Sequence, residues 1–307
     1  MTPTGKKHVR VLRIIARLNV GGPAIQAISL SSELPSKGYQ SMLVCGTIDS
    51  HEGDMAYLAE DRGLTPLVIP ELGREISPVK DLLSFFALLK IIRGFRPHII
   101  HTHTAKAGTL GRLAAITMNM VSRSRNKIRI VHTFHGHTFH SYFNTIKVSI
   151  FVMIEKLLAK FTDRIVVISP LQKDDICHGY RIAKVQKVRV IPLGFDLSRF
   201  RNCENYRKTT REEYLTEESP DTFLVGMIGR LTDVKNHSLL LRTMKNLKDH
   251  GLLGSFRFLI VGDGELRSKI QNEAVNLGVR NAIVFTGWKR DLAPIYGALD
   301  AVVLAVS

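Results

Sequence analysis

Short apolar runs alternate with longer amphipathic segments along almost the whole chain, and this alternation constrains the fold more than any other feature. Apolar runs of strand length cover residues 9–15, 40–45, 65–69, 98–101 and 127–133, and helical patterns separate them. Strands joined through helices pair in parallel, because each helix carries the chain back to the edge from which the next strand starts. The sequence therefore predicts an α/β fold built from doubly wound, Rossmann-like parallel sheets.

A polar, charge-dense stretch at residues 196–220 interrupts this alternation, which restarts with apolar runs at 223–228 and 256–261. A chain of 307 residues is also long for one hydrophobic core, since single cores stop growing at about 250–300 residues. We therefore expect two domains, one over residues 1–204 and a second over residues 205–307.

The second domain is expected to be incomplete. Its fourth apolar run, residues 301–304, almost reaches the last residue of the sequence, Ser307. A sheet that stopped on this strand would leave an apolar edge uncovered.

The net positive charge of the chain indicates which classes of binding partner to expect. Lysine and arginine outnumber aspartate and glutamate by 43 to 27, a net charge of +16, which favours nucleic acids, anionic lipids or phosphorylated substrates. No basic run alternates with aromatic residues as in single-strand binders, so we expect no nucleic-acid partner. Three well-separated cysteines fit a reducing compartment, and no apolar stretch reaches the roughly 18 residues of a spanning helix. We therefore expect a cytoplasmic protein, bound at most to the inner face of a membrane.

Gly21 and Gly22 lie between the first predicted strand and a predicted helix at residues 23–36. A glycine pair in this position lets backbone N–H groups approach a phosphate at the helix N-terminus. The pattern is not the GxGxxG of nicotinamide sites, and a plain tight turn explains it equally well from spacing alone.

Histidines gather after two neighbouring strands. His101 and His103 follow one strand, and a second group that includes His135 and His137 follows the next. We expect both groups where the carboxyl ends of parallel strands open to a cleft. They suit metal ligation or neutral hydrogen bonding to a polar substrate, and each is equally compatible with a buried structural role. Because no carboxylate lies between residues 90 and 147 to complete a hydrolase-type site, we expect no bound metal.

The predicted second domain carries charged and glycine-rich loops at its strand ends. Arg230 and Lys235 follow Gly229 and lead into a helix, an arrangement that can bind a diphosphate through two cations and a helix N-terminus. An ordinary solvated loop is the alternative for these two cations, and helix capping is the alternative for Asp263. The two following strand ends supply the remaining candidates, Gly262, Asp263, Gly264 and Gly287.

In their order along the chain, these motifs resemble those of the large retaining glycosyltransferase group called family four or group one. Gly21 and Gly22 resemble its N-terminal glycine loop, and residues 131–136 resemble its histidine segment. Residues 191–200 resemble its P-N-G-V-D…F segment, with Leu193 in place of the usual asparagine. The three loops of the second domain complete the series, so the resemblance covers nearly the whole chain.

The resemblance implies a GT-B enzyme that transfers a sugar, with retention, from a nucleoside-diphosphate sugar such as a UDP-sugar and needs no other cofactor. It implies that His135 contacts the donor sugar, that Arg230 and Lys235 hold the diphosphate and stabilise the leaving group, and that Gly22 offers its N–H to the donor or acceptor. The other donor-binding positions that it implies are Gly21, Gly229, Gly262, Asp263, Gly264 and Gly287.

On the acceptor side, the histidine runs resemble those of bacterial members that build surface polysaccharides, which implies a glycan or lipid-linked acceptor. His103, Lys106 and His137 are the candidate acceptor-side residues. Residues 80–96 and 142–156 combine apolar faces with basic edges, which is typical of helices that lie on an anionic membrane. Ordinary core packing of these helices is the alternative.

The family also carries a paired-glutamate motif, E-x7-E, a few residues beyond the strand on which this sequence ends. One glutamate of that pair contacts the donor sugar and the other contacts the ribose. We therefore expect residues 1–307 alone to be catalytically weak or inactive.

Three other functions remain open from the sequence. A sugar-nucleotide epimerase or hydrolase of the same fold would consume donor without transferring the sugar. A metal-dependent hydrolase built on the histidines would contain bound metal. A non-catalytic remnant would bind sugar nucleotide without turnover.

Overall fold

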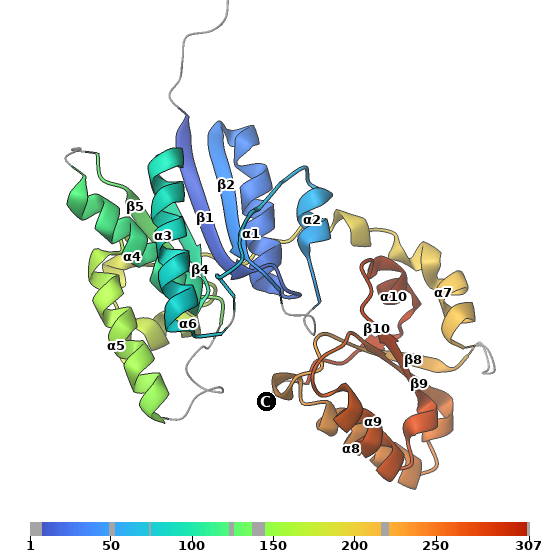
Figure 1. Ribbon diagram of the computed structural model, residues 1–307. Helices are drawn as coiled ribbons and strands as arrows, with labels where there is room; N and C mark the ends of the chain where they lie inside the picture. Colours follow the sequence, from blue (N-terminus) through green and yellow to red (C-terminus); the bar gives the residue numbers. More distant parts are fainter. Residues whose placement is uncertain are drawn as a thin grey trace, which may run out of the picture. The chain divides into compact units, whose positions relative to one another are not determined.

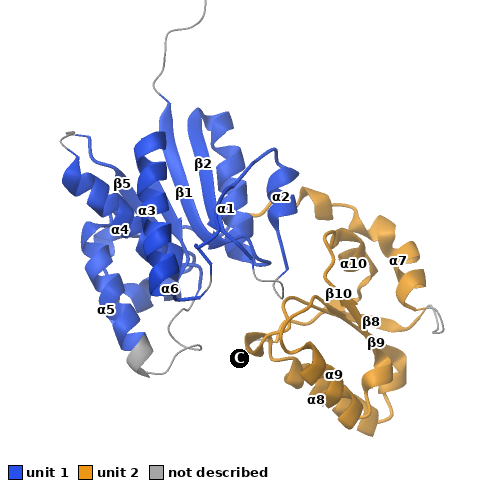
Figure 2. Ribbon diagram, in the orientation of Figure 1, with its two compact units in different colours: residues 1–194 blue, residues 195–307 orange. Residues whose placement is uncertain are grey.

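The computed structural model describes residues 8–48, 53–73, 75–122, 126–136, 145–215 and 221–305. The chain divides into two compact units, Met1–Gly194 and Phe195–Ser307 (Figures 1 and 2). Each unit contains one sheet in which every pair of neighbouring strands is parallel. The α/β fold with two Rossmann-like sheets, predicted from the alternating sequence pattern, is confirmed.

Unit 1 contains a seven-stranded sheet of order β3-β2-β1-β4-β5-β6-β7. Its strands are β1 (Val9–Arg17), β2 (Tyr39–Gly46), β3 (Leu67–Ile69), β4 (Ile99–His103), β5 (Arg129–Thr133), β6 (Arg164–Val167) and β7 (Val188–Val190). Its helices are α1 (Gly22–Glu33), α2 (Ala56–Glu60), α3 (Pro78–Phe95), α4 (Ala105–Val121), α5 (Thr145–Phe161) and α6 (Pro170–Asp174). The strand order reverses between β1 and β4, the place where doubly wound sheets bind ligands.

Both faces of this sheet are covered, because successive strand residues point to opposite faces. On one face, α3 and α4 pack against Leu12, Ile14 and Ile100. On the other face, α1 packs against Ile15 and Leu43. Figure 1 shows α3, α4 and α5 side by side along one face. Strands buried on both faces explain the continuous apolar runs in the sequence.

A buried ion pair joins two of these helices. The Arg112 guanidinium of α4 donates to a Glu155 carboxylate oxygen of α5 over 2.6 Å, and both side chains are fully buried. Arg112 also donates to the Gly108 carbonyl at 2.8 Å. Each charge depends on the other, because an unpaired charge in a dry interior carries a large desolvation cost.

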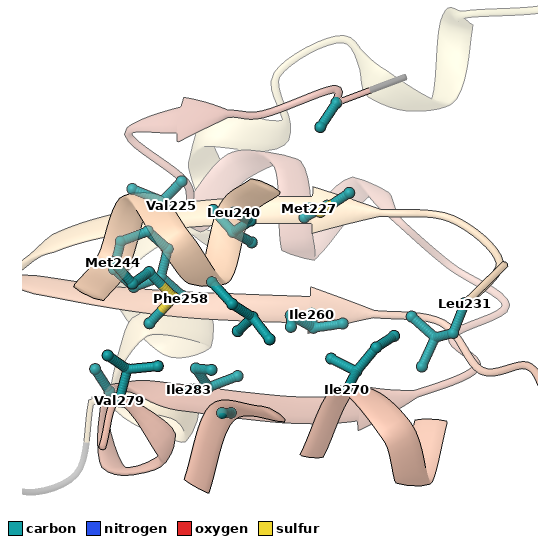
Figure 3. Packing of buried hydrophobic residues seen from close by; sticks show 14 residues of the cluster. Val225, Met227, Leu231, Leu240, Met244, Phe258, Ile260, Ile270, Val279 and Ile283 are labelled. Atoms are coloured by element: carbon teal, nitrogen blue, oxygen red, sulfur yellow. The ribbon is translucent and has the colours of Figure 1, made fainter. Parts of the chain in front are cut away.

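Unit 2 contains a four-stranded sheet of order β10-β9-β8-β11. Its strands are β8 (Phe223–Ile228), β9 (Phe256–Val261), β10 (Ile283–Gly287) and β11 (Ala301–Val302). Its helices are α7 (Arg207–Tyr214), α8 (His237–Asp249), α9 (Arg267–Asn276) and α10 (Ala293–Ala298). Figure 3 shows its core, in which Met227, Phe258 and Ile260 of the strands pack against Met244 of α8 and Ile270 of α9.

The division between the units falls after Gly194, earlier than the boundary after residue 204 that the sequence suggested. The polar stretch that interrupts the alternation contains α7, which packs against α10. Arg207 and Arg211 of α7 both bind the Asp300 carboxylate, with 2.9 Å between Arg211 Nη1 and Asp300 Oδ2. The stretch therefore belongs to unit 2 through ion pairs, which a search for apolar periodicity does not detect.

The ion pair between α4 and α5 yields a stability prediction. Arg112→Met is expected to destabilise the protein by about 3–5 kcal/mol, because it leaves the Glu155 carboxylate buried without a partner. The double variant Arg112→Met, Glu155→Met is expected to recover most of this loss, since it removes both charges. Denaturant unfolding of the four proteins in a double-mutant cycle measures both effects. Independent, additive losses from the two substitutions would contradict the pairing.

Candidate functional site

In unit 1, a row of polar side chains crosses the sheet beneath α1. Leu12 and Ile14 face α3 and α4, so Arg13 between them faces α1, where its guanidinium donates to Ser31 Oγ at 2.7 Å. By the same alternation, His101 and His103 lie on this face. The ring centroids of His101 and His103 are 4.3 Å apart. The row therefore runs from a buried arginine toward the carboxyl end of β4.

His135 completes the row from the end of β5. His103 Nδ1 and His135 Nε2 are 2.7 Å apart and share one proton. His103 Nε2 and His135 Nδ1 are buried and form no hydrogen bond with any residue that the structure describes. Since only one of the paired nitrogens carries the shared proton, one of the two remaining nitrogens is a donor and the other an acceptor. His135 can therefore offer Nδ1 to a substrate hydroxyl in either role.

The electrostatics of this row keep the imidazoles neutral. Burial lowers the pKa of His135 to about 4. Burial also lowers the pKa of His101 and His103 well below the ordinary value, and the nearby Arg13 charge adds to both shifts. Arg13 is itself buried, which lowers its pKa to about 10 and leaves it protonated at neutral pH. A site of neutral histidines beside a fixed cation suits polar recognition more than proton storage.

His132 points to the opposite face of the sheet. Its Nδ1 lies 2.9 Å from Thr102 Oγ1, and its ring packs edge-on against Phe134. Gly108 of α4 makes room for it, because a Cβ atom there would lie 2.5 Å from His132 Cε1. His132 therefore packs between the sheet and α4, apart from the polar row. His137 lies outside the described residues.

The glycine loop of unit 1 lies at the carboxyl end of β1. Gly21 precedes the first residue of α1, Gly22, and no side chain caps this helix. Hydrogen bonds from Val20 N to the Gly53 carbonyl and from Met55 N to the Leu18 carbonyl, both of 2.9 Å, hold the loop. The N-terminus of α1 therefore opens at the same edge of the sheet as His103 and His135.

The Lys106 side chain binds two other residues of unit 1. Its Nζ forms an ion pair of 2.6 Å with Asp81 of α3 and donates to the Glu75 carbonyl. The side chain is only 12% exposed. In this conformation Lys106 links the starts of α3 and α4.

In unit 2, three glycines meet where β8, β9 and β10 end. Gly229 N donates to the Val261 carbonyl and Gly262 N to the Gly287 carbonyl, each at 2.9 Å. A Cβ atom on Gly262 would lie 2.1 Å from the Gly229 carbonyl oxygen, so the loops approach too closely for any larger residue. Gly229, Gly262 and Gly287 also have positive φ angles, of 149°, 130° and 69°, which favour glycine.

The predicted cations lie over this glycine cluster. Lys235 Cε would be 3.1 Å from a Cβ atom on Gly229, so the lysine side chain crosses directly over that residue. The Arg230 guanidinium lies 3.7 Å from the exposed Glu265 carboxylate, the outer limit of an ion pair. Lys235 forms no ion pair among the described residues. Two cations and an open backbone loop form a surface that can bind a diphosphate.

Asp263 has a different local role from helix capping. It does not stand at the N-cap position of α9, which is Leu266. Its Oδ1 accepts from Gly264 N at 2.8 Å, and its Oδ2 binds the Arg267 guanidinium at 2.6 Å. Gly264 lies close beneath Leu231, because a Cβ atom there would be 2.6 Å from the Leu231 carbonyl oxygen.

Arg267 and Trp288 belong to this edge as well, although the sequence did not single them out as site residues. Arg267 lies near Gly287, and Trp288 packs against Gly262. Trp288 is the only tryptophan in the sequence and is 37% exposed. The spacing of four residues between Asp263 and Arg267, at a helix start, was the available signal for this pair.

Among the residues that the structure describes, no group of three or more histidine, cysteine, aspartate or glutamate side chains could hold a metal ion. The imidazoles of the row bind one another or Thr133, with 2.7 Å from His101 Nε2 to Thr133 Oγ1. The groups that these two sites offer are neutral imidazoles in unit 1 and cations with backbone N–H groups in unit 2.

Known proteins with similar sequences match this chain over two thirds of its length or nearly all of it. The chain is 28% identical over 300 residues to an Escherichia coli protein named UDP-Gal:alpha-D-GlcNAc-diphosphoundecaprenol alpha-1,3-galactosyltransferase, a match that covers 97% of this chain and 72% of that protein. It is 26% identical over 205 residues to the capsular polysaccharide biosynthesis glycosyltransferase CapM of Staphylococcus aureus, covering 66% of this chain and 50% of CapM. The chain thus spans only part of the length of these relatives.

A solved structure confirms the fold. Anabaena HepE, crystallised in complex with UDP and glucose, has a TM-score of 0.74 at 16% identity, covering 97% of this chain and 74% of HepE. At this identity the likeness shows the fold alone. Residues 222–307 match the family described as glycosyl transferases group 1. Residues 20–199, more than half of the chain, match Glycosyltransferase Family 4, and the protein therefore belongs to that family.

Proposed function

We propose that this protein transfers a sugar, with retention, from a nucleoside-diphosphate sugar to a lipid-linked glycan in the synthesis of a bacterial surface polysaccharide. The observation that carries this proposal is the glycine cluster of unit 2, with Arg230 and Lys235 directly beside it. Lys235 forms no ion pair among the described residues, and Arg230 forms one of 3.7 Å with the exposed Glu265. Two such cations next to open backbone loops fit a diphosphate better than any neutral ligand.

The relatives support the donor and acceptor classes. The E. coli relative is named for UDP-galactose and a diphosphoundecaprenol-linked acceptor, and the HepE structure contains UDP and glucose. By analogy, we assign a UDP-sugar as donor and a polyprenyl-diphosphate glycan as acceptor. The direct experiment offers labelled UDP-sugars and such an acceptor to the whole protein. Donor consumption without a glycan product would instead favour an epimerase or hydrolase.

In the proposed reaction, the bond between the anomeric carbon and the donor phosphate breaks, and the acceptor hydroxyl forms the new bond on the same face of the sugar. The leaving diphosphate takes the acceptor proton. Arg230 and Lys235 stabilise the negative charge that grows on this diphosphate. His135 holds a donor-sugar hydroxyl through Nδ1, and His103 orients its ring through the 2.7 Å contact.

We also propose that unit 1 contacts an anionic membrane surface through α3. This helix buries Ser84, Leu88 and Ile92. Leu82 and Phe86 lie in its first half, away from this buried face, and are 56% and 57% exposed, so the outward face of the helix carries large apolar side chains. Because α3 runs antiparallel to the strands, these residues lie toward the carboxyl edge, where the polar row ends. No helix in the described part of the chain is long and apolar enough to cross a bilayer.

The first prediction of the proposed function concerns donor binding. UDP is expected to change the fluorescence of Trp288, because this tryptophan packs against Gly262 in the proposed diphosphate site. Arg230→Gln and Lys235→Gln are each expected to weaken UDP binding by about tenfold, as one charge-assisted contact is lost. Lys269→Gln, which removes an exposed charge of α9, is the matched control. Equal affinity of all four proteins for UDP would contradict the site.

The second prediction concerns the neutral state of His135. Its pKa is about 4 in the folded protein and about 6.5 in an unfolded chain. Between these values the unfolded chain binds more protons, so the free energy of unfolding should fall as the pH is lowered from about 6.5 to about 4. Above about pH 6.5 this part of the free energy of unfolding is fully present. Its loss down to about pH 4 amounts to at most about 3 kcal/mol.

Urea unfolding of the wild type and His135→Asn across this pH range measures the effect. The variant is expected to show a shallower decline in stability, because one depressed histidine has been removed. His250→Asn, at an exposed position of unit 2, should retain the full slope. Parallel curves for the wild type and His135→Asn would show that His135 is not held neutral by burial.

The third prediction concerns the membrane. Wild-type protein should float with phosphatidylglycerol vesicles at low salt and dissociate as salt is raised, since basic edges contribute to such contacts. Leu82→Ser combined with Phe86→Ser should reduce flotation, because both side chains are exposed and apolar. Leu239→Ser combined with Leu252→Ser removes two exposed leucines of unit 2 and should have no effect. Equal flotation of all three proteins would contradict the role of α3.

A further inference from the structure

A concave surface lies in unit 1, at the edge of the sheet opposite the polar row. The cavity measures about 690 Å³, within the size range of small-molecule sites. It is lined by the last turns of α5, by the π-helical turn Asp175–Gly179 and by the segment that leads to the 3-10 turn Val185–Lys187. These segments immediately precede β6 and β7, so the cavity opens at the amino ends of the strands.

The charged side chains that line the cavity are all basic. Its apolar part consists of small and medium side chains, including the buried Ile182 and Ala159. No aspartate or glutamate lines the cavity. Its polar part is basic throughout and consists of Lys156, Lys160, His178, Arg181, Lys184 and Lys187.

One of these cations already has a structural role. Lys187 Nζ donates to the carbonyls of Ala159 and Lys160, at 2.8 and 2.9 Å, and so caps the C-terminus of α5. Within the described part of the chain, Lys156, Arg181 and Lys184 form no ion pair. Like charges gathered around one cavity repel one another, and an anion bound between them would relieve that repulsion.

The backbone that presents Arg181 has two uncommon features. Tyr180 N donates to the Asp175 carbonyl at 2.7 Å, the spacing of a π-helix, and such turns often mark functional sites. Arg181 itself has a φ of 52°, a left-handed conformation that costs energy for any residue other than glycine, asparagine or aspartate.

We propose that this pocket binds a phosphate ester, with the phosphate held by Arg181, Lys184 and Lys156 and the organic part placed against Ile182. The proposal does not rest on the transferase function, because the cavity lies at the other edge of the sheet from the histidines. Two sources offer this chemistry, a soluble sugar phosphate or nucleotide and the headgroup of an anionic phospholipid. The cation cluster recognises the phosphate in both.

The experiment uses a pocket variant and a charge-matched control. Arg181→Gly combined with Lys184→Gln removes two lining cations, and the glycine accepts the left-handed backbone, so this variant is expected to fold. Lys208→Gln combined with Lys269→Gln removes two exposed lysines of unit 2 and causes the same change in net charge. Circular dichroism melting verifies that both proteins are folded.

Two probes distinguish the sources. Inorganic pyrophosphate, glucose 1-phosphate and UMP are titrated by calorimetry, and phosphatidylglycerol vesicles are compared with phosphatidylcholine vesicles by flotation. A soluble ligand predicts that the pocket variant binds at least one titrated phosphate about tenfold more weakly than the control. A lipid headgroup predicts that the pocket variant binds every titrated phosphate like the control and floats more weakly only with phosphatidylglycerol. If the pocket variant and the control bind every probe equally, the pocket is not a phosphate site.

Discussion

The structure depends on one constraint, the parallel pairing of every strand in both sheets. Parallel strands bring all their carboxyl ends to one edge, and loops at that edge become neighbours although they are far apart in sequence. His103 and His135 meet in unit 1 for this reason, and Gly229, Gly262 and Gly287 meet in unit 2. The amino ends meet at the other edge, where the basic pocket of unit 1 lies. Each sheet can therefore carry separate chemistry at its two edges.

The two candidate sites differ in charge, because the histidines of unit 1 are neutral and Arg230 and Lys235 of unit 2 are cations. In unit 1, Arg13 brings a positive charge into the interior, and burial together with this charge holds His101 and His103 neutral. In unit 2, Arg230 and Lys235 remain partly exposed, so water stabilises their charges until a ligand arrives. Neutral imidazoles suit the hydroxyl groups of a sugar. Hydrated cations suit a diphosphate, because their positive charges offset the desolvation cost of its negative charges.

Much of the fold followed from the sequence, because period and turn chemistry are local properties. The strands β1 to β5, β8, β9 and β11 lie close to the predicted positions, and Gly21, Gly229 and Gly262 follow strand ends as expected. The helix α7 was not predicted, because its polar sequence shows no apolar periodicity and ion pairs to Asp300 hold it in unit 2. His132 could have been separated from its neighbours, since its place in β5 directs it to the other face. The spacing of four residues between Asp263 and Arg267 could have indicated their ion pair, but the position of Arg267 near Gly287 is defined only by the folded loops.

The sequence by itself determined the class of fold, the family and the residues available at each strand end. These depend on apolar periodicity, glycine placement and charged loops, which the chain carries whatever its distant contacts. Only the tertiary structure decided which histidines come into contact, which cations already have partners and which remain available to a ligand. Lys106 and Lys187 are occupied by Asp81 and by two carbonyls, whereas Lys235 lies over an open glycine loop. That distinction depends on contacts between segments far apart in the chain, because burial and pairing determine what a charge can do.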